Sequence, residues 1–451
     1  MQTWVVPRLI KIFSRPWILW NLGTFFVGGK TMAKFDILED LKWRGAINQQ
    51  TDEKGLRKYL QTHDNLALYC GTDPTGDSLH VGHLIPFMIL KRFQMAGYHP
   101  VILIGEATGS IGDPSGRNSE RVLQSAATID KNKKAITKQM KNLFGTKNFE
   151  IVNNMDWLGK MNLLDFLRDY GKLFQVNNML DKDVVASRLK NGISFTEFSY
   201  QILQAVDFYH LNKYNGVQLQ IGGGDQWGNI TAGIDLIHKL EGPDRPAFGL
   251  TIPLMVKADG TKFGKSTGNA IWLDPEKTSP YEFYQFWINQ DDRDVVKYLK
   301  YFTFLSHEEI DDLAEKTKKE PWKREAQKKL AEEVTKFVHG ESGLKEAQMI
   351  TDALFSGNIK NLSVKQIEQG LKSAPAAEAA DSKQNIVDFL VGTKIEPSKR
   401  QAREDVKNGA IYVNGDREKS IDYDVDPSSA FDGKYVIIRK GKRKYTLVKI
   451  K

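Results

Sequence analysis

The chain has 451 residues, of which 41% are hydrophobic and 27% are charged, and it carries a formal net charge of +8. This composition is ordinary for a soluble globular protein of two or three domains, and it excludes a collagen-like or wholly disordered chain. A single cysteine excludes an intrachain disulfide and a cysteine-based zinc site, and it fits a reducing cytoplasm, where we expect the protein.

Residues 1–31 are apolar and basic, with four cations and no acid. The uncharged run 16–29 is too short to cross a bilayer, so no association with a membrane is expected. An acid-free, Arg-bearing start has some resemblance to a mitochondrial transit peptide, but Met32 opens a segment typical of a natural start. We therefore expect residues 1–31 to be an N-terminal extension that is not part of the functional protein.

The next informative segment joins a strand to a helix. Residues 66–70 form a short apolar run, and residues 79–95 carry apolar side chains at helical spacing. Ser78 is the expected N-cap, which places His80 in the first helical turn. Because unpaired N–H groups and the helix dipole attract anions there, His80 lies where a phosphate would bind.

The same helix start contains two more residues of interest. Gly82 has no side chain, so a flat nucleotide base could approach the helix backbone closely. His83 is expected to face the same cleft. A pair of histidines that only caps the helix is the alternative, and the four-residue pattern H-x-G-H alone does not decide between the two readings.

Short apolar strands recur farther along the chain. Residues 101–105 and 217–222 are apolar runs that end in glycine, and strand and helix patterns alternate from about residue 32 to residue 275. This alternation predicts an α/β fold with a doubly wound, Rossmann-like parallel sheet and a ligand at the carboxyl ends of its strands. Residues 130–190 are expected at its edge, and ordinary surface helices are one interpretation of this segment.

A polar row lies on the predicted helix 195–209. Tyr200, Gln204 and Asp207 follow the spacing i, i+4 and i+7, which puts all three on one face between apolar neighbours. As a pocket wall, this row could hold a small polar molecule. The alternative is an ordinary solvent-exposed face.

The segment 257–268 is rich in Gly and Lys and has no apolar periodicity, which predicts a flexible, exposed loop. Lys262 and Lys265, followed by Ser266, would form a cationic clamp that stabilises charge on a leaving pyrophosphate. A solvated surface loop is the alternative. Considered with H-x-G-H, the lysine pair suggests a protein that splits ATP between its α- and β-phosphates.

The C-terminal third changes character. Residues 279–352 are predicted to be helical and strongly charged, and residues 373–382 read as a linker. The predicted domains are an extension at 1–31, a Rossmann-like catalytic domain at 32–278, an α-helical domain at 279–352, and a C-terminal domain at 353–451 that includes an α+β RNA-binding module at 385–451.

Residues 385–451 contain fifteen Lys and Arg against ten Asp and Glu, which favours a polyanionic partner such as RNA. A helix is expected from Pro397, and a strand at 411–413 precedes the turn signal Asn414-Gly415. A hairpin is expected with strands at 435–438 and 445–450 around a basic turn at 439–444. A solvated basic tail is the alternative. The predicted RNA-binding residues are Lys399, Arg400, Arg403, Arg439, Lys440, Lys442, Arg443 and Lys444.

The motifs together resemble one family. H-x-G-H after a first strand, with a distant K-x-x-K-S, resembles the signature pair of class I aminoacyl-tRNA synthetases. The family usually has K-M-S-K-S, so Phe263 and Gly264 depart from it. Segments 69–75, 112–116, 196–200 and 223–229 narrow the resemblance to bacterial tyrosyl-tRNA synthetases, from about residue 35 to the C-terminus. The resemblance implies that the helical domain 279–352 faces the anticodon region of the tRNA, and that the C-terminal module has the small RNA-binding fold of a ribosomal small-subunit protein.

This resemblance implies a tyrosine site. Asp207 and Tyr69 would bind the phenol hydroxyl, because a phenol donates to a carboxylate and accepts from a tyrosine hydroxyl. Tyr200 and Gln204 would hold the substrate ammonium, with Asp113 as its charge partner. The full implied set is Tyr69, Thr108, Asp113, Tyr200, Gln204, Asp207 and Gln226, with Gln226 near the reacting carboxylate.

The resemblance also implies an ATP site. Asp225 would bind the ribose, Cys70 would lie close to it, and Mg²⁺ would arrive with ATP rather than in a protein cage, so no metal ligands are predicted. The implied ATP-binding residues are Cys70, Gly71, Asp73, Thr75, His80, Gly82, His83, Gly223, Asp225, Lys262, Lys265 and Ser266. Thr75, His80, Lys262, Lys265 and Ser266 would be catalytic, and Arg117 and Arg121 could join them.

The implied activity is that of a tyrosine–tRNA ligase acting on L-tyrosine, ATP and tRNA(Tyr), and the edge segment 130–190 resembles the family's dimer-forming insertion, so a homodimer is expected. A non-catalytic, synthetase-derived RNA-binding protein is the main alternative. A tryptophan-specific relative would have no use for a hydroxyl such as that of Tyr69. Another H-x-G-H nucleotidyltransferase would leave the C-terminal module unexplained.

Overall fold

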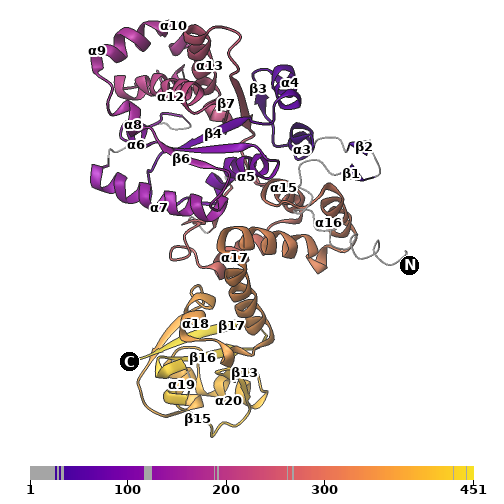
Figure 1. Cartoon of the computed structure of the whole chain (residues 1–451). Coiled ribbons are helices and arrows are strands. Elements are labelled where there is room, and N and C mark those ends of the chain that lie inside the picture. Colours follow the sequence, from indigo (N-terminus) through magenta and orange to yellow (C-terminus); the bar gives the residue numbers. More distant parts are fainter. Residues whose placement is uncertain are drawn as a thin grey trace. The chain divides into compact units, whose positions relative to one another are not determined.

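The structure is a computed structural model that describes residues 26–27, 30–31, 35–115, 124–186, 188–189, 192–261, 263–266, 269–429, 431–442 and 444–451 (Figure 1). The chain forms two compact units, Met1–Asp274 with Ile288–Val334, and Pro275–Trp287 with Thr335–Lys451. The three predicted domains after residue 31 stay a prediction. The extension at 1–31 lies mostly outside the described residues, apart from a pairing of β1 (Phe26–Val27) with β2 (Lys30–Thr31).

The first unit contains a six-stranded sheet in the order β3-β8-β7-β4-β5-β6. Five neighbouring strands are parallel, and only the short edge strand β3 is antiparallel to β8. The predicted doubly wound α/β fold is therefore confirmed. The strands are β3 (Gln49–Gln50), β4 (Ala67–Thr72), β5 (His99–Ile104), β6 (Glu150–Asn153), β7 (Val217–Gly223) and β8 (Phe248–Ile252).

Helices cover both faces of this sheet. Figure 1 shows α5 (Val81–Met95) and α7 (Ala126–Phe144) on one side of the strands, and α12 (Phe195–Tyr214) and α13 (Trp227–Glu241) on the other. The chain changes sides between the neighbouring strands β4 and β7. Ligands bind at such a switch point in doubly wound folds, so the crevice at the carboxyl ends of β4 and β7 is the expected site.

The helix that carries the polar row is longer than expected. It begins at Phe195 as predicted, because the Ser194 side chain accepts a hydrogen bond from the Glu197 N–H, but it continues to Tyr214. Phe208 and Leu211 are fully buried in the core against the sheet. Asp207 is also buried, so the alternative of a solvent-exposed polar face is wrong.

The predicted cap of the H-x-G-H helix is also wrong. Helix α5 starts at Val81, and His80 itself is the N-cap, since its Nδ1 accepts a hydrogen bond from the Gly82 N–H at 3.0 Å. Ser78 cannot serve as the cap because its hydroxyl binds elsewhere: it donates to the Leu79 carbonyl and accepts from Gln139 and from the backbone of Asp274.

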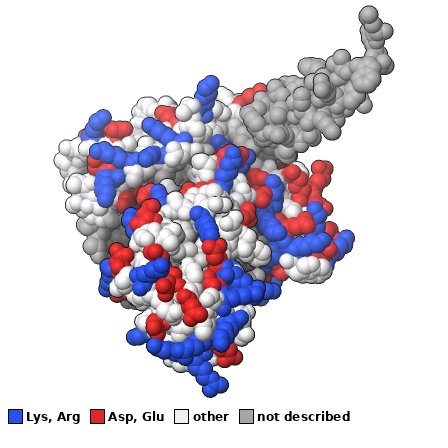
Figure 2. Space-filling view, turned by 90° about the horizontal axis from the view of Figure 1, so that it is seen from below, with Lys and Arg blue, Asp and Glu red and all other residues white. Residues whose placement is uncertain are grey.

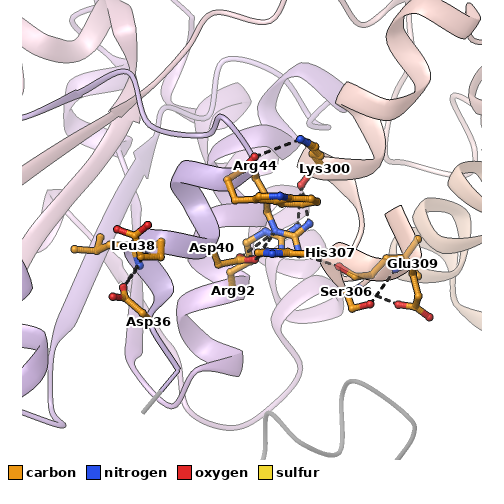
Figure 3. Close-up of polar contacts among 12 residues, drawn as sticks. Asp36, Leu38, Asp40, Arg44, Arg92, Lys300, Ser306, His307 and Glu309 are labelled. Carbon is orange, nitrogen blue, oxygen red and sulfur yellow. Dashed lines mark hydrogen bonds and ion pairs between the residues drawn. The ribbon is translucent and has the colours of Figure 1, made fainter. Parts of the chain in front are cut away.

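Further helices complete the first unit. Helix α15 (Asp292–Phe302) and α16 (His307–Lys319) lie beside α3 (Ile37–Trp43) and α5, joined by the polar contacts of Figure 3. The remaining elements are α4 (Glu53–Thr62), α6 (Glu106–Gly109), α8 (Met155–Leu158), α9 (Leu163–Asp165), α10 (Val176–Leu180), α11 (Asp183–Ala186), β9 (Lys265–Ser266) and β10 (Asn269–Ala270).

The second unit is built around a five-stranded sheet with the order β11-β17-β16-β13-β14. Val436 and Ile438 face a core with α19 and α20, whereas Ile437 and Leu447 face a core with the end of α17 and with α18. Its elements are α14 (Pro280–Ile288), α17 (Glu325–Ser356, shared with the first unit), α18 (Val364–Gly370), β11 (Ala376–Ala379), β12 (Gln384–Asn385), α19 (Ile386–Gly392), α20 (Lys399–Lys407), β13 (Ile411–Val413), β14 (Asp416–Glu418), β15 (Asp424–Val425), β16 (Tyr435–Lys440) and β17 (Lys444–Ile450).

Two expectations for this unit need correction. The predicted linker 373–382 contains β11, which pairs in parallel with β17. The edge of β17 offers hydrogen-bond partners to the backbone of this segment, and amino-acid composition does not reveal such partners. The hairpin strands are longer than predicted, so Arg439 and Lys440 lie in β16 rather than in the turn. The turn at Asn414-Gly415 is confirmed: both residues have positive φ, at 50° and 97°.

No helix among the described residues is long and apolar enough to cross a membrane.

Candidate active site

A cavity of about 270 Å³ opens at the carboxyl ends of β4 and β7. It brings together residues from distant segments of the sequence, including the whole predicted tyrosine set. Its walls contain Tyr69, Cys70, Gly71, Thr72, Asp73, Thr75, His83, Pro86, Leu103, Gly105, Thr108, Asp113, Ser115, Tyr200, Gln204, Asp207, Gln220, Ile221, Gly222, Gly223, Asp225 and Gln226.

Tyr69 and Asp207 are buried side chains of this cavity wall, each with 1% of its surface exposed, and after burial the nearby charge of Asp207 is the next cause that raises the pKa of Tyr69 well above its usual range. The hydroxyl of Tyr69 is buried and has no hydrogen-bond partner within the described part of the chain. A buried hydroxyl without a partner costs about 1–3 kcal/mol, so it indicates a ligand with a complementary group. The carboxylate beside it can accept a hydrogen bond from that same ligand.

Two residues hold Asp207 in place. Asn154 Nδ2 donates to its Oδ2 at 3.0 Å, and Trp157 Nε1 donates to its Oδ1 at 2.8 Å. Burial is the main influence on this carboxyl and raises its pKa to about 7, although both donors oppose the shift. The ionised form therefore dominates above neutral pH, and each of its oxygens already accepts one hydrogen bond from the protein.

A second network surrounds Asp73. Its two carboxylate oxygens accept hydrogen bonds from the Tyr200 hydroxyl at 3.0 Å and the Thr108 hydroxyl at 2.8 Å. Asn154 also donates to the Thr108 hydroxyl, so this network is continuous with the one that holds Asp207. Burial, followed by the charge of Asp73, raises the pKa of Tyr200 well above its usual range, which keeps the hydroxyl protonated as a donor.

The opposite wall is a chain of amides. Gln226 Nε2 donates to Asp113 at 2.8 Å, while its carbonyl oxygen accepts from Gln204 at 3.1 Å and from Asn229 at 3.2 Å. These contacts fix the orientation of the Gln204 and Gln226 side chains. Asp73, Asp113 and Asp225 thus surround the cavity with acidic groups, and burial, aided by Asp113, raises the pKa of Asp225.

The predicted nucleotide residues line the mouth of this cavity, with exceptions. Cys70, Gly71, Thr75, His83, Gly223 and Asp225 contribute to its wall, whereas His80 and Gly82 do not. A Cβ at Gly223 would lie 2.6 Å from Asp225 Oδ1, so a side chain there would displace this carboxylate from its observed position. Burial raises the pKa of the Cys70 thiol to about 12. The thiol is therefore uncharged at neutral pH and lines the cavity without acting as a nucleophile.

His80 and His83 lie together at the start of α5, with ring centroids 3.9 Å apart. The His83 Nδ1 accepts a hydrogen bond from the His80 backbone N–H at 3.3 Å, which completes a reciprocal capping box. A side chain at Gly82 would meet the His80 ring at 2.8 Å and displace the cap. The motif therefore caps the helix and also supplies one cavity wall through His83.

The lysine motif lies next to this helix start. Lys262 lies outside the described residues, and so do the side chains of Lys265 and Ser266, whose backbone forms β9. The expectation of an exposed loop is wrong for Phe263, of which 8% is exposed. Backbone hydrogen bonds from Val81 N to Ile271 O and from Ile271 N to Gly264 O join the two motifs.

Comparisons with known proteins agree with this arrangement. A family model for class I tRNA synthetases (W and Y) matches residues 61–356, and one for the tyrosine–tRNA ligase SYY-like C-terminal domain matches residues 366–448. Over 420 residues the chain is 86% identical to the tyrosine–tRNA ligase of Lactobacillus acidophilus, covering 93% of this chain and 100% of the relative. The chain belongs to the tyrosine–tRNA ligase family of class I synthetases.

Solved structures of this family and of a related one share the fold. The C-terminally truncated mitochondrial tyrosyl-tRNA synthetase of Aspergillus nidulans is 32% identical with a TM-score of 0.65, covering 73% of this chain and 95% of that chain. A tryptophanyl-tRNA synthetase of Encephalitozoon cuniculi, 17% identical with a TM-score of 0.53 and covering 74% and 95% of the two chains, is alike in fold alone. The predicted class I synthetase fold is confirmed.

The predicted RNA-binding residues of this synthetase are not equivalent. Lys440 is held by the buried carboxylate of Glu396 at 2.7 Å and by Asp405 at 2.8 Å, so its charge is used inside the unit. Arg439 lies over the ring of Tyr412, 3.6 Å from its centroid. Lys399 pairs with Asp388, Arg443 lies outside the described residues, and Arg400, Arg403, Lys442 and Lys444 are exposed.

Figure 2 shows Lys and Arg interspersed with Asp and Glu over the face that it draws, so the basic excess of the sequence does not form a surface of one sign there.

Sequence reasoning missed one residue of the cavity wall and two residues that hold Asp207 from behind it. Asn154 and Trp157 follow β6 directly, and the carboxyl end of a parallel strand was the one signal available for them. Gln220 was also missed, although its buried side-chain oxygen has no partner in the described part of the chain. No cluster of three metal-ligating side chains occurs among the described residues.

Proposed function

We propose that this cavity is where tyrosine and ATP react to form tyrosyl-adenylate and pyrophosphate. The family membership establishes tyrosine–tRNA ligase activity for the chain. The observation that supports the location is the buried, unpartnered hydroxyl of Tyr69 beside the carboxylate of Asp207. A substrate phenol satisfies both groups at once, because its oxygen accepts a hydrogen bond from Tyr69 and its O–H donates one to Asp207.

At the other end of tyrosine, acidic groups surround the ammonium. Tyr200 and Gln204 bind it, Asp113 supplies the countercharge, and Thr108 lies nearby. Asp73 holds both Tyr200 and Thr108, so it positions the tyrosine side of the pocket as well as bordering the nucleotide. Asp113 accepts a hydrogen bond from Gln226 and so holds its side chain next to the carboxylate of tyrosine that reacts.

ATP enters beside the tyrosine carboxylate. Asp225 binds the ribose, Gly71 and Gly223 allow a close backbone approach, and His83 with Cys70 borders the nucleotide. Mg²⁺ accompanies ATP through its phosphates and not through a protein cage. Thr75, His80, Lys262, Lys265 and Ser266 stabilise the pyrophosphate as it leaves.

The chemistry needs no general base. The tyrosine carboxylate is already a nucleophile, so its oxygen attacks the α-phosphorus and the bond to the β-phosphate bridging oxygen breaks. Catalysis then consists of alignment and stabilisation of charge on the leaving pyrophosphate. In the second step the terminal adenosine hydroxyl of tRNA(Tyr) attacks the tyrosyl carbonyl and releases AMP.

Measuring the transfer of tyrosine to tRNA distinguishes the proposed enzyme from a non-catalytic RNA-binding protein. With labelled tyrosine, ATP and tRNA(Tyr), the protein should label the tRNA at its 3′ end and release AMP. Binding of tRNA without labelling would support the non-catalytic alternative and defeat the proposal.

The pKa of Asp207 gives a prediction for pH. Since that pKa is about 7, Asp207 becomes protonated below neutral pH and no longer accepts a hydrogen bond from the phenol. Its new O–H also has to share the site with the N–H groups of Asn154 and Trp157, which donate to the same carboxyl. The value of kcat/KM for tyrosine should fall about tenfold between pH 8 and pH 6. Measured at saturating ATP, the Asp207→Asn variant should lack this inflection, and a flat wild-type profile would contradict the account.

We propose that the protein is a homodimer through the edge segment. Leu163, Leu164 and Val176 of this segment are between 57% and 72% exposed, and burying such large apolar side chains against a second copy would stabilise a dimer. Sedimentation should give the mass of two chains for the wild type and of one chain for a Leu163→Asp, Leu164→Asp variant. A wild-type monomer would contradict the proposal.

The exposed cations of the second unit should bind tRNA phosphates. Replacing Lys442 and Lys444 with Ala should weaken tRNA binding and reduce the logarithmic salt dependence of the affinity by about 2, with no loss of stability. Lys440→Ala is the matched contrast, because it leaves the buried Glu396 uncompensated and should lower the melting temperature. An unchanged salt dependence for the double variant would exclude these two lysines.

A cytoplasmic location, and a functional protein that does not need residues 1–31, stay predictions from the sequence.

A further inference from the structure

The lysine loop has an aromatic anchor. Phe263 lies between the two motif lysines and inserts its ring against helix α15, with its centroid 5.0 Å from that of Tyr298 and 5.2 Å from that of Phe302. The Phe263 and Phe302 rings are tilted by only 24° to each other. Aromatic pairs at this separation add to the free energy of burial, so the site is specific for a ring or a side chain of similar volume.

The next residue, Gly264, contacts the start of helix α5. Gly264 has φ of +89°, and a Cβ there would lie 3.1 Å from Val81 Cγ2 and 3.4 Å from the Gly82 backbone nitrogen. Its carbonyl accepts from Ile271, whose own carbonyl accepts from Val81. Glycine at this position thus allows the loop backbone to lie against the H-x-G-H helix start.

The base of the loop is tied to the same helix α15. Asp294 accepts a hydrogen bond from the Ala258 backbone nitrogen at 2.9 Å, and Lys297 donates to the Val256 carbonyl at 3.2 Å. Asp294, Lys297, Tyr298 and Phe302 all belong to α15. One helix therefore holds the loop at its base and at its motif.

Helix α15 is itself fixed to the catalytic fold by two buried arginines (Figure 3). Arg44 donates to the Lys300 and Leu305 carbonyls at 3.2 and 2.8 Å, and Arg92 of α5 donates to the Lys300 and Thr303 carbonyls. Arg44 bonds Asp40 at 2.9 Å, and Arg92 lies 3.7 Å from the same carboxylate. Burial would raise the pKa of Asp40, but the two arginines outweigh it and keep the pKa low.

We propose that Phe263 is a positioning residue for the transfer of the adenylyl group: its anchorage on α15 fixes the loop backbone at Phe263 and Gly264 against the start of α5, and the two lysines of the motif act from this fixed backbone. The inference rests on the proposed function of the lysines. The proposal also explains the two residues that depart from K-M-S-K-S. Phe263 packs its ring on α15, and Gly264 has no side chain that would keep the loop away from α5. The site that binds tyrosine does not contact Phe263.

The test measures single-turnover tyrosyl-adenylate formation together with the dissociation constant for tyrosine. Phe263→Ala should lower the rate about tenfold or more, because small misplacements of charge-stabilising groups are costly, and leave tyrosine binding unchanged. Phe263→Met should restore most of the rate, since methionine refills an irregular apolar pocket. Phe248→Ala is the matched control: Phe248 is also 8% exposed, lies in the same unit, and should leave the rate per folded site unchanged.

A double-mutant cycle decides whether Phe263 acts through the lysines. In a Lys265→Ala, Lys262→Ala background, Phe263→Ala should change the remaining rate by a factor of about one. An equal fold-loss in both backgrounds, or a tyrosine affinity that falls with the rate, would overturn the proposal. If Phe263→Ala does not fold, Phe302→Leu opens the same pocket from α15 and enters the same cycle. A wild-type protein that forms no adenylate would instead refute the proposed function.

Discussion

Replacing Asp207 with Asn should lower kcat/KM for tyrosine by about a thousandfold while the KM for ATP stays within about twofold. The Asn amide keeps one oxygen but introduces a donor where Asn154 and Trp157 already donate, and the substrate phenol loses its acceptor. In the complex with tyrosine, the substrate O–H and the amide N–H of the variant would both be buried donors without an acceptor, at a cost of about 4 kcal/mol, which corresponds to this change in kcat/KM. The measurement is tyrosine-dependent ATP–pyrophosphate exchange with each substrate varied in turn.

The control for this variant is Asp235→Asn on α13. It makes the same chemical change at a carboxylate that is 59% exposed and forms an ion pair with Lys239, so activity should stay at the wild-type level. If Asp207→Asn activated tyrosine as well as this control does, the phenol would lie elsewhere and the pocket assignment would be wrong.

The second large effect concerns the lysine motif. Lys262→Ala and Lys265→Ala should each lower the rate of adenylate formation about a hundredfold, with little change in tyrosine affinity. Cations that act on charge developing on a leaving group change the rate, whereas uniform binding would change KM. Stopped-flow adenylate formation with tyrosine titration separates the two effects, and Lys257→Ala gives a control for charge in the same loop.

Equal losses of rate and of tyrosine affinity in the two motif variants would show that the lysines bind the ground state. That outcome would contradict their assignment to pyrophosphate, and it would also remove the basis for Phe263 as a positioning residue.

The sequence was most informative where a local pattern had one structural meaning. Alternating strands and helices predicted the doubly wound sheet, and the i, i+4, i+7 spacing put Tyr200, Gln204 and Asp207 on one face of a helix. Periodicity could not tell whether that face was buried. The tertiary contacts decided it, because α12 packs against the sheet, and Asn154 and Trp157, at the cap and within helix α8, bond Asp207.

Competition among partners explains most of the errors. Ser78 is a good N-cap by type, but Gln139 and the Asp274 backbone occupy its hydroxyl, and His80 takes the cap. The segment 373–382 has the composition of a linker, yet the edge of β17 recruits Ala376–Ala379 as a strand. Such long-range partners have no local signature in the sequence.

The loop 257–268 shows a different limit. Its composition predicts an exposed, flexible segment, but Phe263 finds an aromatic site on α15 that is formed by residues 35 and 39 positions later in the chain. The departure from K-M-S-K-S was visible, but its meaning depended on Tyr298 and Phe302.

The most direct test of this account is ATP–pyrophosphate exchange with each of the twenty amino acids, using protein that starts at Met1 and protein that starts at Met32. The account predicts exchange with tyrosine alone, and at the same rate for both proteins. Exchange with a different amino acid, or with none, would contradict the assignment of Tyr69 and Asp207 as the groups that select the substrate.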